Sequence, residues 1–395
     1  MKQFFPFIAL VAILAACNTV NPPTPNLSIK RGQVVNYEHR AFVSKERIRT
    51  SIADSVPDSL ILYDVDAFRL TYGTIQENEP IVTTALILVP KGVKDTQYVA
   101  YMHGTNIPME AFGATAKMPS NYDFVTMPFD NEVLTFALSF AANGRTVIMP
   151  DYIGFGPTAN KEHVFIYYPE LRFQTIDALL AFKEHEHIQH KMPLLIAGWS
   201  QGGGAALSLQ YYLQRDYKDE FTVLSTAALA GVHHYSALIE YVLKDTTGIL
   251  PPTMLSTWAV YCVNRFGLHR PNDQIFTNRV TNQVEACLGQ VGDVWELFRP
   301  AFLSGVLNGT DTEWINVAKS NDFYQGWCPT GKVFLHHGTH DALVPYMNSA
   351  DAYQGLTQAG GDVTLYTYPN GGHSTHTYTF VKQTIQDWKN LNNQQ

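Results

Sequence analysis

Ser200 has the clearest capacity for chemistry in this chain, because it stands between glycines in the string GWSQG at residues 198–202. An apolar run at residues 194–197 precedes the string, and a helical pattern at residues 205–213 follows it. A strand that turns at once into a helix strains the backbone at the turn, and nearby glycines leave room for that turn. The serine hydroxyl is then exposed at the sheet edge, where it can attack an ester or amide carbonyl. We therefore predict that Ser200 is a nucleophile.

An acid and a histidine follow the serine in the chain. Residues 332–337 are typical of a buried strand, and Asp341 lies in the loop after it. Residues 363–368 alternate as a strand does, and a glycine-containing turn leads directly to His373. A carboxylate can orient an imidazole that takes the serine proton, so we predict Asp341 as the acid and His373 as the general base. Alternatively, Asp341 caps the helix expected shortly after it, and both roles are compatible if its two oxygens have different partners.

His376 is the alternative base, three residues after His373. Ser374 or Thr375 is a typical N-cap for the periodic segment at residues 378–388, which places His376 in the first helical turn. The positive end of the helix dipole opposes protonation there. Because the base must become an imidazolium during acylation, we favour the loop histidine.

The oxyanion of an acyl-transfer reaction needs hydrogen-bond donors, and backbone amides are the usual ones beside such a serine. The amide of Gln201, directly after the serine, is the first candidate. The second comes from Gly104 or Thr105, in a loop that follows a strand-like run at residues 98–102. The other interpretation of that loop is an ordinary turn.

The order serine, acid, histidine and the motifs around it resemble the secretory lipase family of α/β-hydrolases. The resemblance rests on the string GWSQGG at residues 198–203 and on MPDYIGFG at residues 149–156. It also rests on the large segment between Ser200 and the acid, and on the spacing from Asp341 to His373. The string HGT that contains Gly104 and Thr105 departs from those lipases and is more similar to other esterase and peptidase branches.

The resemblance implies an α/β-hydrolase fold, with a mostly parallel central sheet, helices on both faces and a helical lid insertion. It also implies hydrolysis of acylglycerols or related esters through an acyl-enzyme. The composition agrees with one large unit, because 395 residues with 46% hydrophobic content can bury a sizeable core. We expect an antiparallel meander at residues 60–89 to lead into the sheet.

The predicted core comprises residues 31–232 and 329–395, and the predicted lid comprises residues 233–328, where helical patterns replace strands. This segment carries many aromatic residues, and we expect most of them to pack the segment's own core. Inserted before the strand that carries the acid, it is expected to lie above Ser200 and to supply an apolar wall. Of its three cysteines, Cys262, Cys287 and Cys328, one pair is able to form a disulfide, and spacing does not decide which.

The first residues indicate export. Residues 1–16 have the charged start and short apolar run of a signal peptide. The string LAAC that ends at Cys17 resembles the lipobox of bacterial lipoproteins. That family implies a lipidated Cys17, a proline-rich tether at residues 17–30 and a place in the bacterial cell envelope, attached to a membrane by the lipid. The alternative is an ordinary signal peptide with a chance cysteine.

The net charge and the motifs that the sequence lacks argue against several classes of function. The formal net charge of −8 and the absence of a basic run argue against nucleic-acid partners. The zincin spacing His-Glu-x-x-His and the Walker and dinucleotide glycine patterns are absent, so we predict neither a metal nor a cofactor. The leading hypothesis is a serine hydrolase of small-molecule esters or lipids. The alternatives are a serine peptidase on the same fold and a non-catalytic surface-binding lipoprotein.

Overall fold

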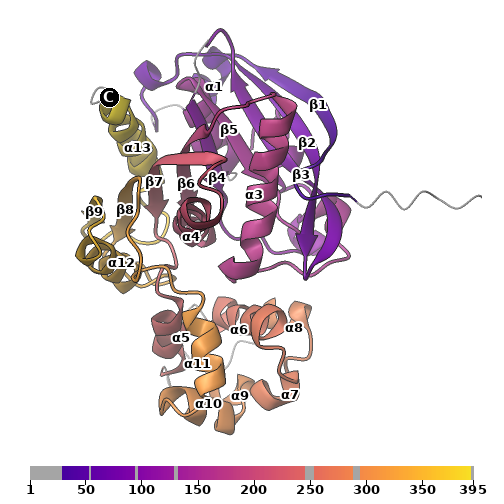
Figure 1. The fold of residues 1–395 in the computed structure, drawn as a ribbon, viewed down its shortest axis with the longest axis vertical. Helices are drawn as coiled ribbons and strands as arrows, with labels where there is room; N and C mark the ends of the chain where they lie inside the picture. Colours follow the sequence, from indigo (N-terminus) through magenta and orange to yellow (C-terminus); the bar gives the residue numbers. More distant parts are fainter. Residues whose placement is uncertain are drawn as a thin grey trace, which may run out of the picture.

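The computed structural model describes residues 29–52, 55–93, 97–128, 132–244, 253–287 and 294–392 (Figure 1). Within these residues, nine strands form one sheet in the order β1-β2-β3-β5-β4-β6-β7-β8-β9. The strands are β1 (Val34–Val43), β2 (Val65–Gln76), β3 (Glu79–Pro90), β4 (Gln97–Met102), β5 (Arg145–Pro150), β6 (Met192–Trp199), β7 (Phe221–Leu229), β8 (Lys332–Gly338) and β9 (Val363–Tyr368).

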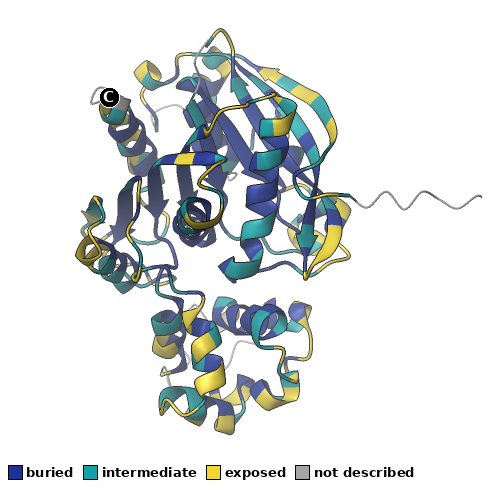
Figure 2. Cartoon of the chain, viewed as in Figure 1, coloured by how far each residue is buried: buried dark blue, intermediate teal, exposed yellow. Residues whose placement is uncertain are grey.

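The sheet combines an antiparallel edge with a parallel centre. Strands β1, β2 and β3 pair antiparallel, and β3 joins β5 in the same sense. All pairs from β5 through β4, β6, β7 and β8 to β9 are parallel. The central strands are almost wholly buried, as expected for parallel strands covered on both faces, whereas the edge strand β1 is mostly half-buried or exposed (Figure 2). The predicted meander and parallel sheet are therefore confirmed, and β1 is an added edge strand.

Helices cover both faces of the sheet. Successive residues of each strand point to opposite sides, so both faces carry apolar side chains that must be buried. Leu194 and Ile196 of β6 belong to one apolar cluster, and Leu195 and Ala197 belong to the other. The first cluster is closed by α3 (Tyr168–His185), α4 (Gln201–Asp216) and α12 (Met347–Gln358). The second is closed by α1 (Lys45–Ser51), α2 (Leu138–Ala142) and α13 (Thr377–Asn392).

The chain between β7 and β8 forms a separate group of helices beyond the sheet (Figure 1). Tyr241 and Trp295 of this segment are exposed, but many of its aromatic residues are buried, among them Tyr235, Trp258, Tyr261, Phe266, Phe298 and Phe302. The ring of Trp258 stacks on Phe165 of the core at 4.1 Å, so the two parts are in contact. The helices are α5 (Tyr235–Leu243), α6 (Thr253–Val263), α7 (Asn272–Ile275), α8 (Gln283–Cys287), α9 (Val294–Leu297), α10 (Pro300–Leu307) and α11 (Thr312–Lys319).

The cysteines of this part of the chain are free thiols. Cys262 and Cys287 are buried in α6 and α8, and Cys328 is exposed. The predicted signal peptide and Cys17 lie outside the described residues. Across the ranges that the structure describes, no helix combines the length and apolar character needed to cross a membrane.

Candidate active site

Ser200 occupies the turn between β6 and α4. Its backbone has φ 58° and ψ −122°, a conformation that serine rarely adopts. The amide of Ser200 donates to the Leu229 carbonyl of β7 at 2.9 Å, and its carbonyl accepts from the amides of Gly203 and Gly204. These bonds on both sides of the turn hold the strained conformation in place.

The glycines near Ser200 allow α4 to lie against the sheet. A Cβ atom at Gly202 would stand 1.9 Å from the Met102 carbonyl oxygen of β4, and one at Gly198 would stand 2.1 Å from the Gly202 carbonyl oxygen. Neither approach is possible for a side chain. The glycine pattern of the sequence therefore corresponds to close contact between helix and strand.

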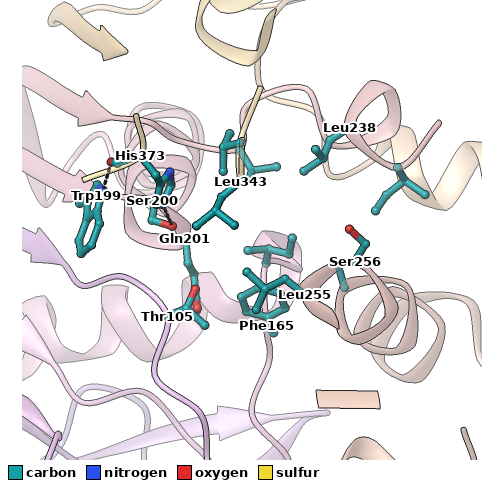
Figure 3. A pocket seen from close by; sticks show the side chains of 15 residues that line it. Thr105, Phe165, Trp199, Ser200, Gln201, Leu238, Leu255, Ser256, Leu343 and His373 are labelled. Atoms are coloured by element: carbon teal, nitrogen blue, oxygen red, sulfur yellow. Dashed lines mark hydrogen bonds between the residues drawn. The ribbon is translucent and has the colours of Figure 1, made fainter. Parts of the chain in front are cut away.

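Ser200, His373 and Asp341 form one chain of hydrogen bonds. The Nε2 atom of His373 lies 2.8 Å from Ser200 Oγ (Figure 3), and its Nδ1 atom lies 2.7 Å from Asp341 Oδ2. A carboxylate oxygen only accepts, so Nδ1 carries the proton and Nε2 accepts from the serine hydroxyl. The three residues lie after β6, β8 and β9, at the carboxyl ends of parallel strands. The structure thus brings together the three residues singled out in the sequence.

Asp341 uses its two oxygens differently. Oδ1 accepts from the amides of Leu343 and Val344, both at 2.9 Å, while Oδ2 faces His373. Oδ1 therefore closes a turn within the loop. The alternative interpretation of Asp341 as a helix cap is wrong, because α12 begins only at Met347 and its N-cap is Tyr346.

Asp341 is held as a carboxylate. Burial opposes its ionisation, but hydrogen bonds from His337 and His373 keep the pKa of Asp341 well below its usual range. It therefore carries its negative charge at neutral pH and can stabilise an imidazolium beside it.

His337 is a partner of Asp341 that sequence reasoning did not identify. Its buried Nε2 atom lies 2.8 Å from the Val344 carbonyl oxygen and 3.3 Å from Asp341 Oδ2. Because both oxygens only accept, Nε2 carries a proton; its Nδ1 atom lies 2.7 Å from Ser349 Oγ. The available signal was the spacing of four residues between His337 and Asp341. That spacing predicts a side-chain contact within a helix, but not between a strand and the loop that follows it.

His376 lies where the sequence did not place it. Helix α13 begins at Thr377, so His376 precedes the helix, and the expectation that it occupies the first turn is wrong. The reason is that Thr375 Oγ1 accepts from the Gly372 amide at 3.0 Å and closes the preceding turn. The His376 ring stacks on Tyr368, with centroids 4.3 Å apart. Among the hydrogen bonds of the described residues, none joins His376 to Ser200 or Asp341.

Trp199 links the serine turn to the histidine loop. Its indole Nε1 donates to the His373 carbonyl at 3.1 Å, and the two rings are 5.5 Å apart (Figure 3). The residue directly before Ser200 thus holds the backbone of the residue that accepts the serine proton. Trp199 was part of the quoted motif, but the sequence assigned it no contact.

The three candidate oxyanion residues differ in whether their backbone amides already have a hydrogen-bond partner. The Gln201 amide is the first of α4 and has no partner within the helix. The Gly104 amide is occupied, because it donates to Glu132 Oε1 at 2.8 Å. The Thr105 amide has no hydrogen-bond partner in the described part of the chain, and Thr105 borders the same cavity as Ser200. Of the two alternatives in that loop, the structure leaves Thr105 available.

A buried histidine fixes the side chain of Gln201. His163 Nδ1 lies 2.9 Å from the Ile153 carbonyl oxygen, so it carries the proton. Burial lowers the pKa of His163 to about 4, which makes the ring neutral, and its Nε2 atom then accepts from Gln201 Nε2 at 3.1 Å. No motif in the sequence pointed to His163.

Ser200 opens on a cavity of about 210 Å³ (Figure 3). Its wall comes from the core and from helices α5 and α6 of the insertion. In the described residues, no aspartate, glutamate, lysine or arginine lines it. The apolar part of the wall comprises Phe165, Ile166, Trp199, Val232, Leu238, Ile239, Leu255, Ala259, Leu343 and Val344.

The chain is similar to known hydrolases. A family model described as serine aminopeptidase, S33, matches residues 131–378. No curated protein sequence matches the chain.

Solved structures resemble the whole described fold. The ligand-bound rice cell wall degrading esterase LipA of Xanthomonas oryzae has a TM-score of 0.74 at 19% identity, covering 93% of this chain and 100% of that one. Candida antarctica lipase A in its closed state has a TM-score of 0.64 at 15% identity, covering 91% and 83%. At these identities the likeness shows the fold, and it confirms the predicted α/β-hydrolase class.

Proposed function

The chain belongs to the serine aminopeptidase S33 family of hydrolases, and from that premise we propose that it hydrolyses carboxylic esters with an apolar acyl group. The observation that carries the proposal is the hydrogen-bonded chain Ser200–His373–Asp341 at the mouth of an apolar cavity. The chemistry is acyl transfer to a serine, followed by hydrolysis of the acyl-enzyme.

The first half of the reaction acylates Ser200. His373 Nε2 takes the hydroxyl proton while Oγ forms a bond to the ester carbonyl carbon, and the carbonyl oxygen becomes an oxyanion. The amides of Gln201 and Thr105 donate to that oxyanion. The tetrahedral intermediate then breaks its bond to the alcohol oxygen, which leaves with the proton from His373.

The second half restores the enzyme. His373 removes a proton from a water molecule, whose oxygen attacks the acyl carbon, and Ser200 leaves as the proton returns to it. Asp341 stabilises the imidazolium in both halves by its charge and keeps the ring oriented through Nδ1.

The cavity favours an ester over an aminopeptidase substrate. An aminopeptidase must hold the α-ammonium group of its substrate, for which a carboxylate is the natural partner. Among the described residues that line the cavity there is no carboxylate, and the wall is mainly aliphatic. A non-catalytic role is disfavoured, since the serine, the histidine and the acid are all present with hydrogen-bond geometry.

We also propose that the insertion, residues 233–328, is a lid over Ser200. Leu238 and Ile239 of α5, with Leu255 and Ala259 of α6, supply much of the apolar wall. Their position opposite Ser200 supports a role in holding the acyl chain and excluding water during acylation.

A panel of p-nitrophenyl esters of increasing acyl length, beside aminoacyl anilides, tests the proposed function. Each methylene buried against the wall adds about 0.8 kcal/mol, so we expect kcat/KM to rise about fourfold per methylene over the first few carbons. The anilides should be turned over far more slowly. Faster turnover of aminoacyl anilides than of any ester would overturn the proposal in favour of a peptidase.

We also propose that the protein is exported and held at the bacterial cell envelope by a lipid on Cys17. The support is the sequence of residues 1–30, in which a short apolar run ends at this cysteine. Acyl chains bind a bilayer through their buried methylenes, so the anchor depends on the thiol that carries them.

Cys17→Ser should move the protein from the membrane fraction to the soluble fraction. Serine lacks the thiol to which the lipid attaches, and hydrolase activity per folded molecule should be unchanged. The measurement is the distribution of activity between membrane pellet and supernatant in a high-salt wash. A variant that stays in the pellet would contradict the anchor.

A further inference from the structure

One carboxyl group joins the loop that carries Thr105 to the strand before it. The Gly104 amide donates to Glu132 Oε1 at 2.8 Å, and the Tyr101 hydroxyl donates to Glu132 Oε2 at 2.7 Å. Tyr101 lies in β4, and Gly104 lies two residues after the end of that strand. Glu132 therefore bridges the strand and the loop immediately before Thr105.

Gly104 is enclosed between Glu132 and the serine turn. A Cβ atom at Gly104 would lie 2.9 Å from Glu132 Oε1 and 3.3 Å from the carbonyl oxygen of Trp199. Because Trp199 directly precedes Ser200, the loop packs on the backbone of the turn that presents the nucleophile. A shift of Gly104 away from Glu132 therefore changes the position of the Thr105 amide relative to Ser200.

Glu132 stands on a well-packed element. It directly precedes the π-helical segment Val133–Ala137, which continues into α2, and π-helical turns are frequent at functional sites. Phe136 of that segment is buried and stacks on Tyr101 at 5.4 Å and on Trp199 at 6.1 Å. The element that carries the carboxyl group thus packs on both the strand and the serine turn that it connects.

We propose that Glu132 is a positioning residue for the second oxyanion donor: by occupying the Gly104 amide, it directs the Thr105 amide to the substrate carbonyl oxygen. The inference rests on the proposed function and assigns a role to a residue that does not touch the substrate. It also explains why only one of the two adjacent amides of the loop is available to the oxyanion.

The role does not require a negative charge. Burial raises the pKa of Glu132 to about 7, against the lowering effect of the bonds from Tyr101 and Gly104. Near neutral pH a substantial share of the carboxyl groups is thus protonated, and an oxygen remains to accept from Gly104. A neutral amide of the same shape is therefore expected to replace it.

The test compares Glu132→Met, which keeps the volume but removes the acceptors, with Glu132→Gln, which keeps an acceptor. With the best p-nitrophenyl ester, Glu132→Met should lower kcat about 10²-fold and change KM less than about threefold, as for loss of an oxyanion donor. Glu132→Gln should stay within about fivefold of the wild type. The Ki of an alkyl boronic acid, which forms a tetrahedral adduct on the serine, should rise with Glu132→Met by a factor similar to the loss in kcat.

Two further variants separate positioning from stability. Tyr101→Phe removes the other hydrogen bond of Glu132, so it should lower the melting temperature yet keep kcat within about threefold of the wild type. Glu132→Asp retains a polar group that is one methylene shorter and should give an intermediate loss of kcat, which serves as the test if Glu132→Met does not fold.

The outcomes distinguish the inference from the proposed function. Wild-type kcat in folded Glu132→Met, or in Glu132→Asp if the methionine variant does not fold, would overturn the inference. So would a loss of kcat without a matching rise in the boronate Ki. In those cases the ester hydrolysis by the wild type and its loss in Ser200→Ala would still stand. A wild-type protein that hydrolyses no ester would overturn the proposed function, and the inference with it.

Discussion

Ser200→Ala should lower ester turnover by a factor on the order of 10⁴ or more while the protein stays folded. The substitution removes the attacking oxygen, whose hydrogen bond within the described residues is to His373. It removes almost no buried volume, and the backbone bonds that hold the turn remain. The measurements are kcat with the best ester and the melting temperature from circular dichroism.

A matched control and a chemical label sharpen this prediction. Ser208→Ala removes a buried serine hydroxyl from α4, the helix that follows Ser200; this hydroxyl donates to the Ala205 carbonyl, and its loss should leave turnover unchanged. Treatment of the wild type with a fluorophosphonate should place the adduct on Ser200, as located by mass spectrometry of its peptides. An adduct on another serine, or full turnover by Ser200→Ala, would contradict the mechanism.

The sheet and the relation of the three candidate residues were predictable because they depend on local patterns and on one geometric rule. Short apolar runs indicated the parallel strands, and the carboxyl ends of neighbouring parallel strands share an edge. Loops after β6, β8 and β9 therefore bring Ser200, Asp341 and His373 together although 173 residues separate the serine from the histidine. The structure agrees with the predicted sheet in both its parallel and its antiparallel part.

The supporting contacts were not predictable, because each joins residues that no motif connects. Glu132 reaches Gly104 across 28 residues, from a segment that belongs to none of the motifs quoted from the sequence. That contact decides which amide of the loop is free, so the sequence alone left Gly104 and Thr105 as alternatives. His163 likewise reaches Gln201 across 38 residues through a buried hydrogen bond.

The start of α13 was predicted wrongly for a different reason. A threonine before a periodic segment is typical of an N-cap, yet the same hydroxyl can bond to a nearby turn. Thr375 bonds to the Gly372 amide, and the helix begins two residues later, at Thr377. His376 therefore stands directly before the helix, where its carbonyl accepts from the Phe380 amide, and the preference for His373 rests on its bonds to Ser200 and Asp341.

Those bonds give the second large prediction: His373→Ala should lower turnover nearly as far as Ser200→Ala, because the imidazole is the acceptor of the serine proton. Residues that act as one unit are not additive, so the double variant should be scarcely worse than either single variant. His376→Ala is the matched control, since its ring stacks on Tyr368 away from the hydrogen-bonded chain, and it should cost less than about tenfold. The measurement is kcat for the wild type and the four variants with one ester. An inactive His376→Ala beside an active His373→Ala would contradict this assignment. A double variant with turnover far below that of both single variants would show that the serine and the histidine do not act as one unit.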